Sequence, residues 1–160
     1  QATVAADGTY DLAVPDGKDI TPYIIATGHH SIYLQTFHTD GQNLEHVNFQ
    51  VPSDVIYGAL AALLSVPLAA DGNPAKCVIV STFNTKNVRG LSYADFIAYG
   101  AHGVAGATAT GSPALPPAVY FNENVIPDPS KTESSKDGGV LFLNVPDGVY
   151  TIEDTAFVRQ

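Results

Sequence analysis

Methionine and tryptophan are missing from this sequence, and charged residues are few. Charged side chains make up 14% of the chain, against about 25% in an ordinary soluble domain. Seven residues are Lys or Arg and sixteen are Asp or Glu, which gives a net charge of −9. Because a protein that binds nucleic acid needs clustered Lys and Arg to neutralise phosphates, this balance argues against a nucleic-acid partner.

Cysteine is almost absent, and no apolar run is long. The single cysteine, Cys77, excludes an intrachain disulfide. We expect its side chain to be small, apolar and buried, because a reactive thiol needs a cationic neighbourhood that the sequence does not reveal. The longest strongly apolar run is Val55–Val66, well short of the roughly 20 residues that span a bilayer. The sequence therefore predicts no membrane-spanning helix.

The residues that are plentiful favour strands. Apolar residues make up 45% of the chain, and Thr, Val, Tyr, Gly and Pro are common. This composition is typical of strands joined by tight turns, so we expect a mostly β fold. Such low-charge chains are common outside the cell, and removal of a signal peptide would explain why the first residue, Gln1, is not Met. We expect a secreted or cell-surface protein.

Changes of pattern divide the chain into three parts. These are a β half-module at residues 1–51, a helix and linker at 52–75, and a second β module at 76–160, with one interlocked domain as the alternative. The half-module should hold four or five antiparallel strands, and Pro22 must lie on a sheet edge or among the first residues of its strand. The expected strands are Thr9–Val14, Ile20–Ala26, Ser31–His38 and Leu44–Val51.

An Ala- and Leu-rich segment, Val55–Leu64, predicts a bridging helix with Ser53 or Asp54 as its cap. Its apolar residues fall on one face, which should dock onto a sheet. The residues of that face are Ile56, Leu60, Leu63 and Leu64. Pro67 and the turn residues that follow it end the helix.

The second module alternates strands with turns and one short helix. The expected strands are Cys77–Phe83, Val104–Thr110 and Val119–Asn122, and the expected short helix is Ser92–Tyr99. Within Asp137–Ile152 we expect two more strands, one before and one after a Pro-Asp-Gly turn. Residues 127–138 are the most polar stretch of the chain, so we expect them to form an exposed loop.

One sequence motif occurs twice in the chain. Asp7–Gly17 (DGTYDLAVPDG) and Asp137–Ile152 (DGGVLFLNVPDGVYTI) both run from Asp-Gly through apolar residues to Val-Pro-Asp-Gly. The second phrase, with Gly103–Thr110 (GVAGATAT) before it, resembles the carboxypeptidase-regulatory-like, transthyretin-like β-sandwich family. The resemblance implies antiparallel β-sandwich modules, which are usually non-catalytic and bind protein or carbohydrate at cell surfaces. One hydrolytic branch ends in Tyr-Arg-Gly-Ser, which has no counterpart in the final TIEDTAFVRQ.

Neither copy of this pattern is complete. The first lacks the opening strands and the second has little room for the closing ones. Incomplete sheets leave unpaired edges, and such edges recruit other strands. Either the two halves complete each other, or a neighbouring subunit supplies the missing strands, which would give a dimer or a filament.

Histidines offer one candidate metal site. His38 and His46 flank the predicted Thr39–Gly41 hairpin, and two such imidazoles bind Zn²⁺ or Cu²⁺ when a third ligand joins them. The candidates for that ligand are Asp40, Glu45 and His102. The alternative is that these are surface histidines beside a turn. Ca²⁺ at the Pro-Asp-Gly turns is a further possibility, without the dense acidic spacing of a dedicated site.

Carboxylates and aromatic residues offer two other candidate sites. Four carboxylates cluster in sequence, as in a glycoside hydrolase, or simply face water on a polar loop; they are Glu123, Asp128, Glu133 and Asp137. A binding face for a sugar or a protein is predicted from aromatic residues on the strand Ser31–His38 and the short helix, with a packed inner face as the alternative. Its residues are Tyr33, Phe37, Tyr93 and Tyr99.

We therefore expect a non-catalytic extracellular structural, assembly or binding protein that needs no cofactor. Its partners would be copies of itself in a filament or surface layer, another surface protein, or a glycan. A small metal-dependent enzyme that uses the histidine pair and a carbohydrate-binding module are the alternatives.

Overall fold

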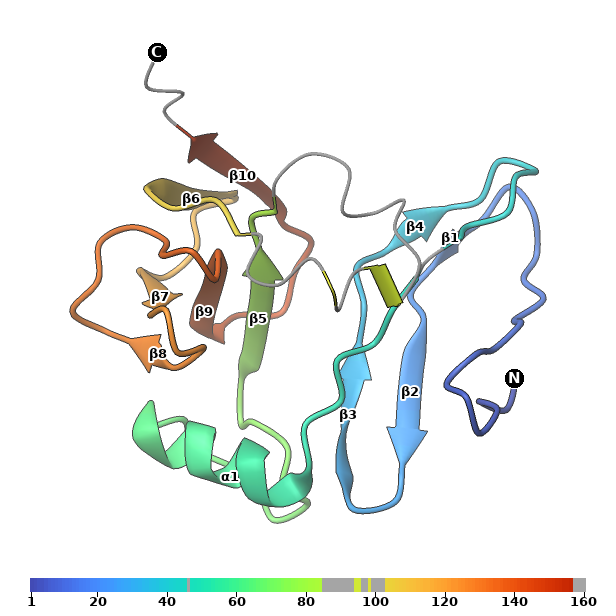
Figure 1. Cartoon of the computed structure of the whole chain (residues 1–160), viewed down its shortest axis with the longest axis horizontal. Helices are drawn as coiled ribbons and strands as arrows, with labels where there is room; N and C mark the ends of the chain where they lie inside the picture. Colours follow the sequence, from blue (N-terminus) through green and yellow to red (C-terminus); the bar gives the residue numbers. More distant parts are fainter. Residues whose placement is uncertain (46, 85–93, 96–97, 99–102, 157–160) are drawn as a thin grey trace. The chain divides into compact units, whose positions relative to one another are not determined.

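The computed structural model describes residues 1–45, 47–84, 94–95, 98 and 103–156. Antiparallel strands dominate it, with one α-helix among the described residues, so the prediction of a mostly β fold is confirmed (Figure 1). The chain divides into two compact units, Gln1–Asp54 and Val55–Gln160. The short helix predicted at Ser92–Tyr99 lies largely outside the described residues.

The first unit contains two small sheets. Its strands are β1 (Asp19–Ile20), β2 (Tyr23–Ala26), β3 (His29–Tyr33) and β4 (Phe37–His38). β1 pairs with β4 and β2 pairs with β3, both antiparallel. Two longer strands were expected here. Pro22 separates β1 from β2, and residues 34–36 separate β3 from β4.

Two other predicted strands, Thr9–Val14 and Leu44–Val51, are not formed in the described residues. Side chains rather than a ladder connect these segments. The Tyr10 hydroxyl donates to the Val47 carbonyl over 2.5 Å, and the rings of Tyr10 and Phe49 lie 5.9 Å apart. The prediction failed because β4 takes β1 as its partner instead of the segment after the Thr39–Gly41 turn.

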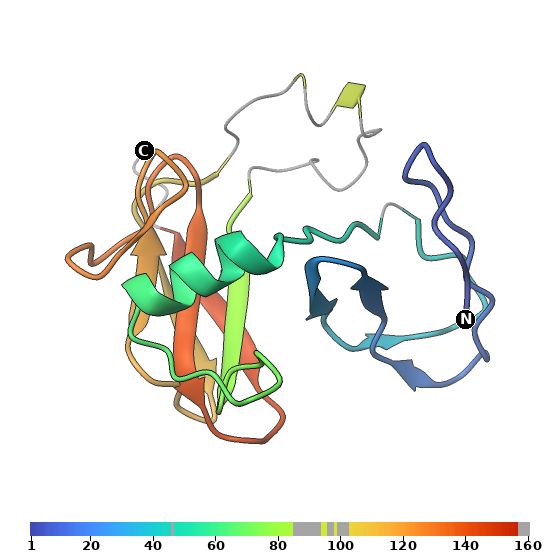
Figure 2. The same cartoon turned by 90° about the horizontal axis from the view of Figure 1, so that it is seen from below.

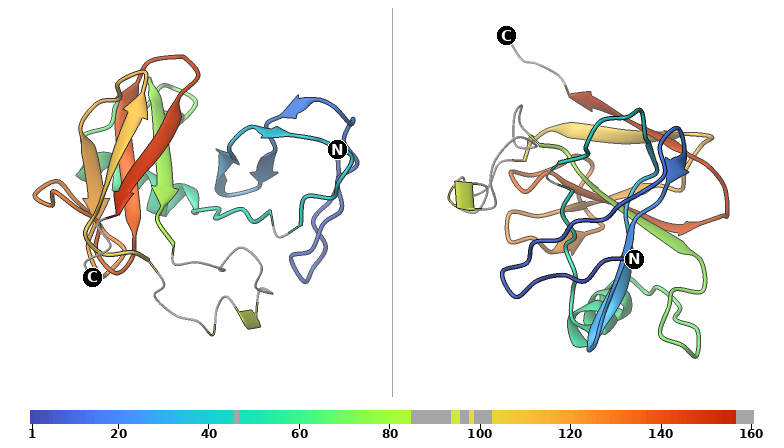
Figure 3. Two further views of the ribbon diagram at one scale, coloured as in Figure 1. Left: turned by 90° about the horizontal axis from the view of Figure 1, so that it is seen from above. Right: turned by 90° about the vertical axis from the view of Figure 1, so that its right-hand side faces the viewer.

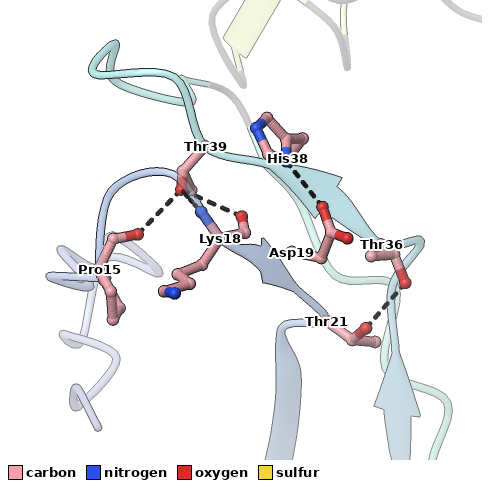
Figure 4. A network of polar contacts seen from close by, with 7 residues as sticks. All are labelled: Pro15, Lys18, Asp19, Thr21, Thr36, His38 and Thr39. Atoms are coloured by element: carbon pink, nitrogen blue, oxygen red, sulfur yellow. Dashed lines mark hydrogen bonds and ion pairs between the residues drawn. The ribbon is translucent and has the colours of Figure 1, made fainter.

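Thr39 decides that pairing. It is the one buried residue among those described in the first unit. Its hydroxyl accepts from the Lys18 N–H (2.9 Å) and donates to the Pro15 carbonyl (2.9 Å), as Figure 4 shows. Its backbone N–H donates to the Lys18 carbonyl (2.9 Å), and its own carbonyl accepts from Gly17 (3.1 Å). The strand β4 is thereby fixed to the first Pro-Asp-Gly turn by polar contacts.

We predict that Thr39→Val will destabilise the first unit by about 1 kcal/mol, because the shape is kept while part-buried backbone groups of Pro15 and Lys18 lose a hydrogen-bond partner. Native-state hydrogen exchange at the Gly17 and Thr39 amides measures this. Thr36→Val is the matched control, since that hydroxyl shares an exposed hydrogen bond with the Thr21 hydroxyl (2.9 Å). Equal protection in the two variants would contradict the role given to Thr39.

The second unit has two sheets and a helix. A four-stranded antiparallel sheet runs in the order β5-β9-β7-β8, and β6 pairs with β10 in a separate two-stranded sheet. The bounds are α1 (Asp54–Leu63), β5 (Cys77–Thr82), β6 (Ala107–Ser112), β7 (Ala118–Phe121), β8 (Pro127–Asp128), β9 (Gly139–Val145) and β10 (Thr151–Ala156). In Figures 2 and 3, α1 lies across one side of the larger sheet and β6 and β10 lie on the other. The two strands predicted around the second Pro-Asp-Gly turn thus join different sheets.

The core of the second unit is centred on β9, which lies between β5 and β7. Its buried cluster draws side chains from both sheets. The cluster comprises Phe83, Ala107, Tyr120, Val140, Phe142 and Val145. This packing fits a β-sandwich, while membership of the transthyretin-like family stays a prediction.

A β-bulge near the end of β9 determines the face on which Val145 lies. Between Phe142 and Val145 the strand carries one residue more than its partner β5, and Asn144 has a left-handed backbone (φ 55°). Asn tolerates this conformation better than other residues with side chains. Because strand side chains alternate, the extra residue returns Val145 to the face of Val140 and Phe142.

The helix α1 matches its predicted position within one residue at each end, but its inward face differs. Ile56 and Leu63 are exposed, and Ala61 is the buried residue of the helix. The half-buried positions around it are Tyr57, Gly58, Leu60 and Leu64. Burial raises the pKa of the Tyr57 phenol. Residues 57, 60, 61 and 64 follow the spacing of one helical face. The predicted face was based on Leu and Ile alone, and it is rotated about the helix axis from the observed one.

The polar stretch 127–138 is not the exposed loop that we expected. Ser134 and Ser135 are buried. The Ser134 hydroxyl accepts from the Ala107 N–H (2.9 Å) and donates to the Val104 carbonyl (2.5 Å). The prediction failed because small hydroxyl side chains can be buried when they satisfy backbone groups of a neighbouring segment.

Gly103 lies where three backbone segments meet. Its N–H donates to the Lys136 carbonyl (3.0 Å), and the next residue, Val104, donates to the Phe83 carbonyl (2.9 Å). A Cβ on Gly103 would lie 2.2 Å from the backbone carbon of Asp137. Only glycine therefore allows this approach.

We predict that Gly103→Ala will lower the free energy of unfolding by about 1–3 kcal/mol through overpacking. Gly58→Ala is the control, because a Cβ there meets nothing within 4 Å and a helical glycine costs roughly 1 kcal/mol relative to alanine. That control should stabilise the protein. Denaturant unfolding followed by circular dichroism compares the two, and stabilisation by both substitutions would contradict the close approach.

Candidate binding face

Tyr23 and Tyr33 form an exposed aromatic pair on the β2–β3 hairpin. They are directly opposite each other in the ladder, with ring centroids 5.2 Å apart and planes 19° from parallel. The Leu34 N–H donates to the Pro22 carbonyl (2.9 Å), so the neighbouring pair, Tyr23 and Tyr33, takes the non-hydrogen-bonded position. Side chains approach most closely at that position, which explains the stacking.

Ile25 extends this exposed surface. The exposed fraction is 57% for Tyr23, 75% for Ile25 and 67% for Tyr33. Ile24 and Ile32, which point to the opposite side of the hairpin, are half-buried. We call the surface made by Tyr23, Ile25 and Tyr33 the tyrosine face.

The tyrosine face overlaps only partly with the predicted binding face. Tyr33 belongs to it, whereas Phe37 is half-buried and lies on β4, in the other small sheet. Tyr93 and Tyr99 lie outside the described residues. Sequence reasoning missed Tyr23 and Ile25. The signal that would have found them is the two-residue turn Thr27-Gly28 (Gly28 φ 73°), which brings the strand before it back along His29–Tyr33.

The histidine site is described only in part. The His38 Nδ1 atom lies 2.8 Å from the Asp19 Oδ1 atom, and both side chains are exposed (Figure 4). A carboxylate on one ring nitrogen leaves the other to face outward, as in metal-bound histidines. His46 and His102 lie outside the described residues, and the strand of His38, β4, pairs with β1.

No group of three His, Cys, Asp or Glu side chains in the described part of the chain is placed to hold a metal ion. Asp40 and Glu45, two of the proposed third ligands, are exposed. The Zn²⁺ or Cu²⁺ site therefore stays a prediction, and the orientation of His38 by Asp19 is the structural observation that supports it.

Several carboxylates serve as turn formers. In five places among the described residues, an Asp or Asn side chain accepts a hydrogen bond from the backbone N–H two residues later, an arrangement that stabilises tight turns. The pairs are Asp7 with Thr9, Asp71 with Asn73, Asn122 with Asn124, Asp128 with Ser130 and Asp137 with Gly139. Two of the four carboxylates considered for glycoside hydrolysis, Asp128 and Asp137, are engaged in this way, and Glu123 and Glu133 are exposed.

In two of these turns the hydrogen bonds lower the pKa of the Asp carboxyl. The Ser130 hydroxyl and N–H, which lie 2.6 and 3.0 Å from the Asp128 Oδ1 atom, hold the pKa of that carboxyl below its usual value. The Thr9 N–H and hydroxyl do the same for Asp7. Hydrogen bonds to a carboxylate favour its charged form, which accounts for the direction.

Cys77 is exposed, so its expected burial is wrong. It is the first residue of β5, an outer strand of the larger sheet, and its Sγ atom lies 3.8 Å from the Asp147 Oδ1 atom. Burial was expected because a free cysteine usually behaves as a small apolar residue, but Cys77 begins an outer strand of the sheet.

Comparisons leave the family of the chain open. No family model, curated protein or solved structure matches it. Within the residues that the structure places, no helix is long and apolar enough to cross a membrane.

We predict that Ser130→Ala will raise the pKa of the Asp128 carboxyl toward the reference value of about 3.9, because the stronger of its two donors is removed. Since the folded-state pKa is depressed, the stabilisation from this turn is present at neutral pH and is lost as the pH falls through that pKa. Carboxyl-carbon NMR titration measures the shift. Asp7, which has its own donors, is the internal control and should not move.

Proposed function

We propose that this chain is a non-catalytic structural subunit that associates with other subunits through the strand edges of its first unit. The observation that carries the proposal is that no apolar side chain is buried among residues 1–45 and 47–54. Thr39, a polar residue, is the one that is buried there.

A unit of this kind has little to offset its loss of conformational freedom. Ordering the backbone costs roughly 1–2 kcal/mol per residue, and apolar burial is the main term that opposes this cost. A two-stranded sheet is marginally stable in water unless more strands or a packed layer are added. Large apolar side chains remain exposed in this unit instead: Val4, Leu12, Val14, Tyr23, Ile25, Tyr33 and Leu44.

The strands of the first unit also have room for partners. Among the described residues, each of β1, β2, β3 and β4 is paired with a single strand. An unpaired edge is a template for another strand, and the addition of a strand supplies both main-chain hydrogen bonds and side-chain contacts. Association thus provides what this unit lacks.

The second unit supplies the stable part of the subunit. Its core joins side chains of both its sheets around β9, where Val140, Phe142 and Val145 are fully buried. We infer a division of roles, in which residues 55–160 fold around their own core and residues 1–54 carry the surface for association. On composition, we place the subunit outside the cell, in a surface assembly.

We predict oligomers whose mass rises with protein concentration and which survive a chelator. Size-exclusion chromatography with light scattering, at two concentrations with and without EDTA, measures this. Hydrogen exchange read by mass spectrometry adds a local test, because association should increase protection in peptides from residues 1–54 but not in β9. A monomer at every concentration, with unchanged exchange, would overturn the proposal. Loss of the oligomers in EDTA would favour a metal site instead.

A further inference from the structure

We propose that two copies of this chain pair through the outer edge of β2, in a two-fold symmetric dimer that joins their tyrosine faces. This inference rests on the proposed function and names the edge and the occupant: a second copy of the same strand. Three observations carry it, namely a free edge, an absence of charge along the hairpin, and a neighbouring edge that is already occupied.

The backbone register shows which groups of β2 are free. The Leu34 N–H donates to the Pro22 carbonyl, and strand residues alternate in direction, so the backbone groups of Tyr23 point away from β3. β3 is the single ladder partner of β2. No residue that the structure describes donates or accepts a backbone hydrogen bond at the outer edge of β2.

The outer edge of β3 is partly covered. The His30 N–H donates to the Pro52 carbonyl (3.0 Å), and His29 forms a β-bridge with Ser53. The Asp54 N–H donates to the Gly28 carbonyl (3.0 Å) at the end of the hairpin. Because the hairpin has one free edge and one covered edge, pairing through β2 uses the same surface on both copies. The assembly is then a closed dimer, with no free hairpin edge for a third copy. The product is a four-stranded sheet in the order β3-β2-β2-β3.

Charge selects a second copy as the occupant. None of the sixteen Asp and Glu or seven Lys and Arg residues lies between Ile20 and Thr39. Two copies that each carry a net charge of −9 repel each other, so a surface without carboxylates is the most favourable place for them to meet. Proteins usually guard an edge strand with charges, and β2 has none. A charged partner would find nothing to pair with on this surface.

The tyrosine face adds side-chain contacts to the backbone pairing. The side chains of Tyr23 and Ile25 are exposed on β2 itself, next to the edge. In an antiparallel β2–β2 pair these side chains meet their symmetry mates on the same face of the new sheet. Cross-strand aromatic and β-branched pairs stabilise such sheets. The stacked tyrosines of each copy would then continue across the dimer axis.

The test introduces a charge at the edge. Ile25→Lys places like charges together across the two-fold axis, and we expect the dimer dissociation constant to rise at least about tenfold, which corresponds to ~1.4 kcal/mol. Val80→Lys is the matched control. It makes the same change at a similarly exposed position on β5 (60% for Val80) in the second unit, and its dissociation constant should stay close to that of the unaltered chain. Ile25→Thr, which keeps a β-branched uncharged side chain, should still dimerise.

Sedimentation equilibrium of the full chain gives the dissociation constants, and far-ultraviolet circular dichroism shows that each variant is folded. If Ile25→Lys and Val80→Lys form oligomers with equal dissociation constants, the β2 interface is wrong, while the proposed function stands. Assemblies larger than a dimer that persist in the Ile25→Lys variant would also overturn the β2 interface. A monomer at all concentrations would overturn both. Binding of the monomer to an insoluble glycan, lost in Tyr33→Ala, would assign the tyrosine face to carbohydrate instead.

Discussion

Burial of β9 is the interaction on which the second unit depends. The strand is hydrogen-bonded on both edges, to β5 and β7, and its inward side chains contact the β6–β10 sheet in one cluster. The bulge at Asn144 keeps the last inward residue on the correct face. Nothing equivalent exists in the described residues of the first unit, where order comes from the hydrogen bonds of Thr39. The two units therefore differ in what holds them, and the first is the one that a partner can stabilise.

The sequence was most informative where burial dominates. The run that became β5 was predicted almost to the residue, as Cys77–Phe83 against the observed Cys77–Thr82, because β-branched and apolar residues dominate it. Leu44–Val51 alternates clearly and Thr9–Val14 weakly, yet neither segment forms a strand in the described residues. Alternation specifies a strand only where one of its faces is buried, and the first unit buries no apolar face. The register of β4 instead follows one hydroxyl, that of Thr39, which no periodicity reveals.

The candidate site was predictable only in part for a similar reason. Tyr33 could be found from its strand, but its neighbour Tyr23 depends on register, which is set by the Thr27-Gly28 turn and the bond from Leu34 to Pro22. Asp128 and Asp137 looked like candidate acids from composition, whereas their role in turns emerges only when the N–H groups two residues later are placed. Ser134 and Cys77 reversed their expected burial because exposure depends on which segments lie beside them, not on polarity.

The stacked tyrosines have a spectroscopic consequence. Because the chain contains no tryptophan, its near-ultraviolet circular dichroism and its fluorescence come chiefly from tyrosine. Tyr23 and Tyr33 are exposed and contact each other ring to ring, so their signals respond to solvent and to any molecule that covers them. A change at the edge of β2 is therefore visible without an attached dye, and the unaltered chain reports on its own surface.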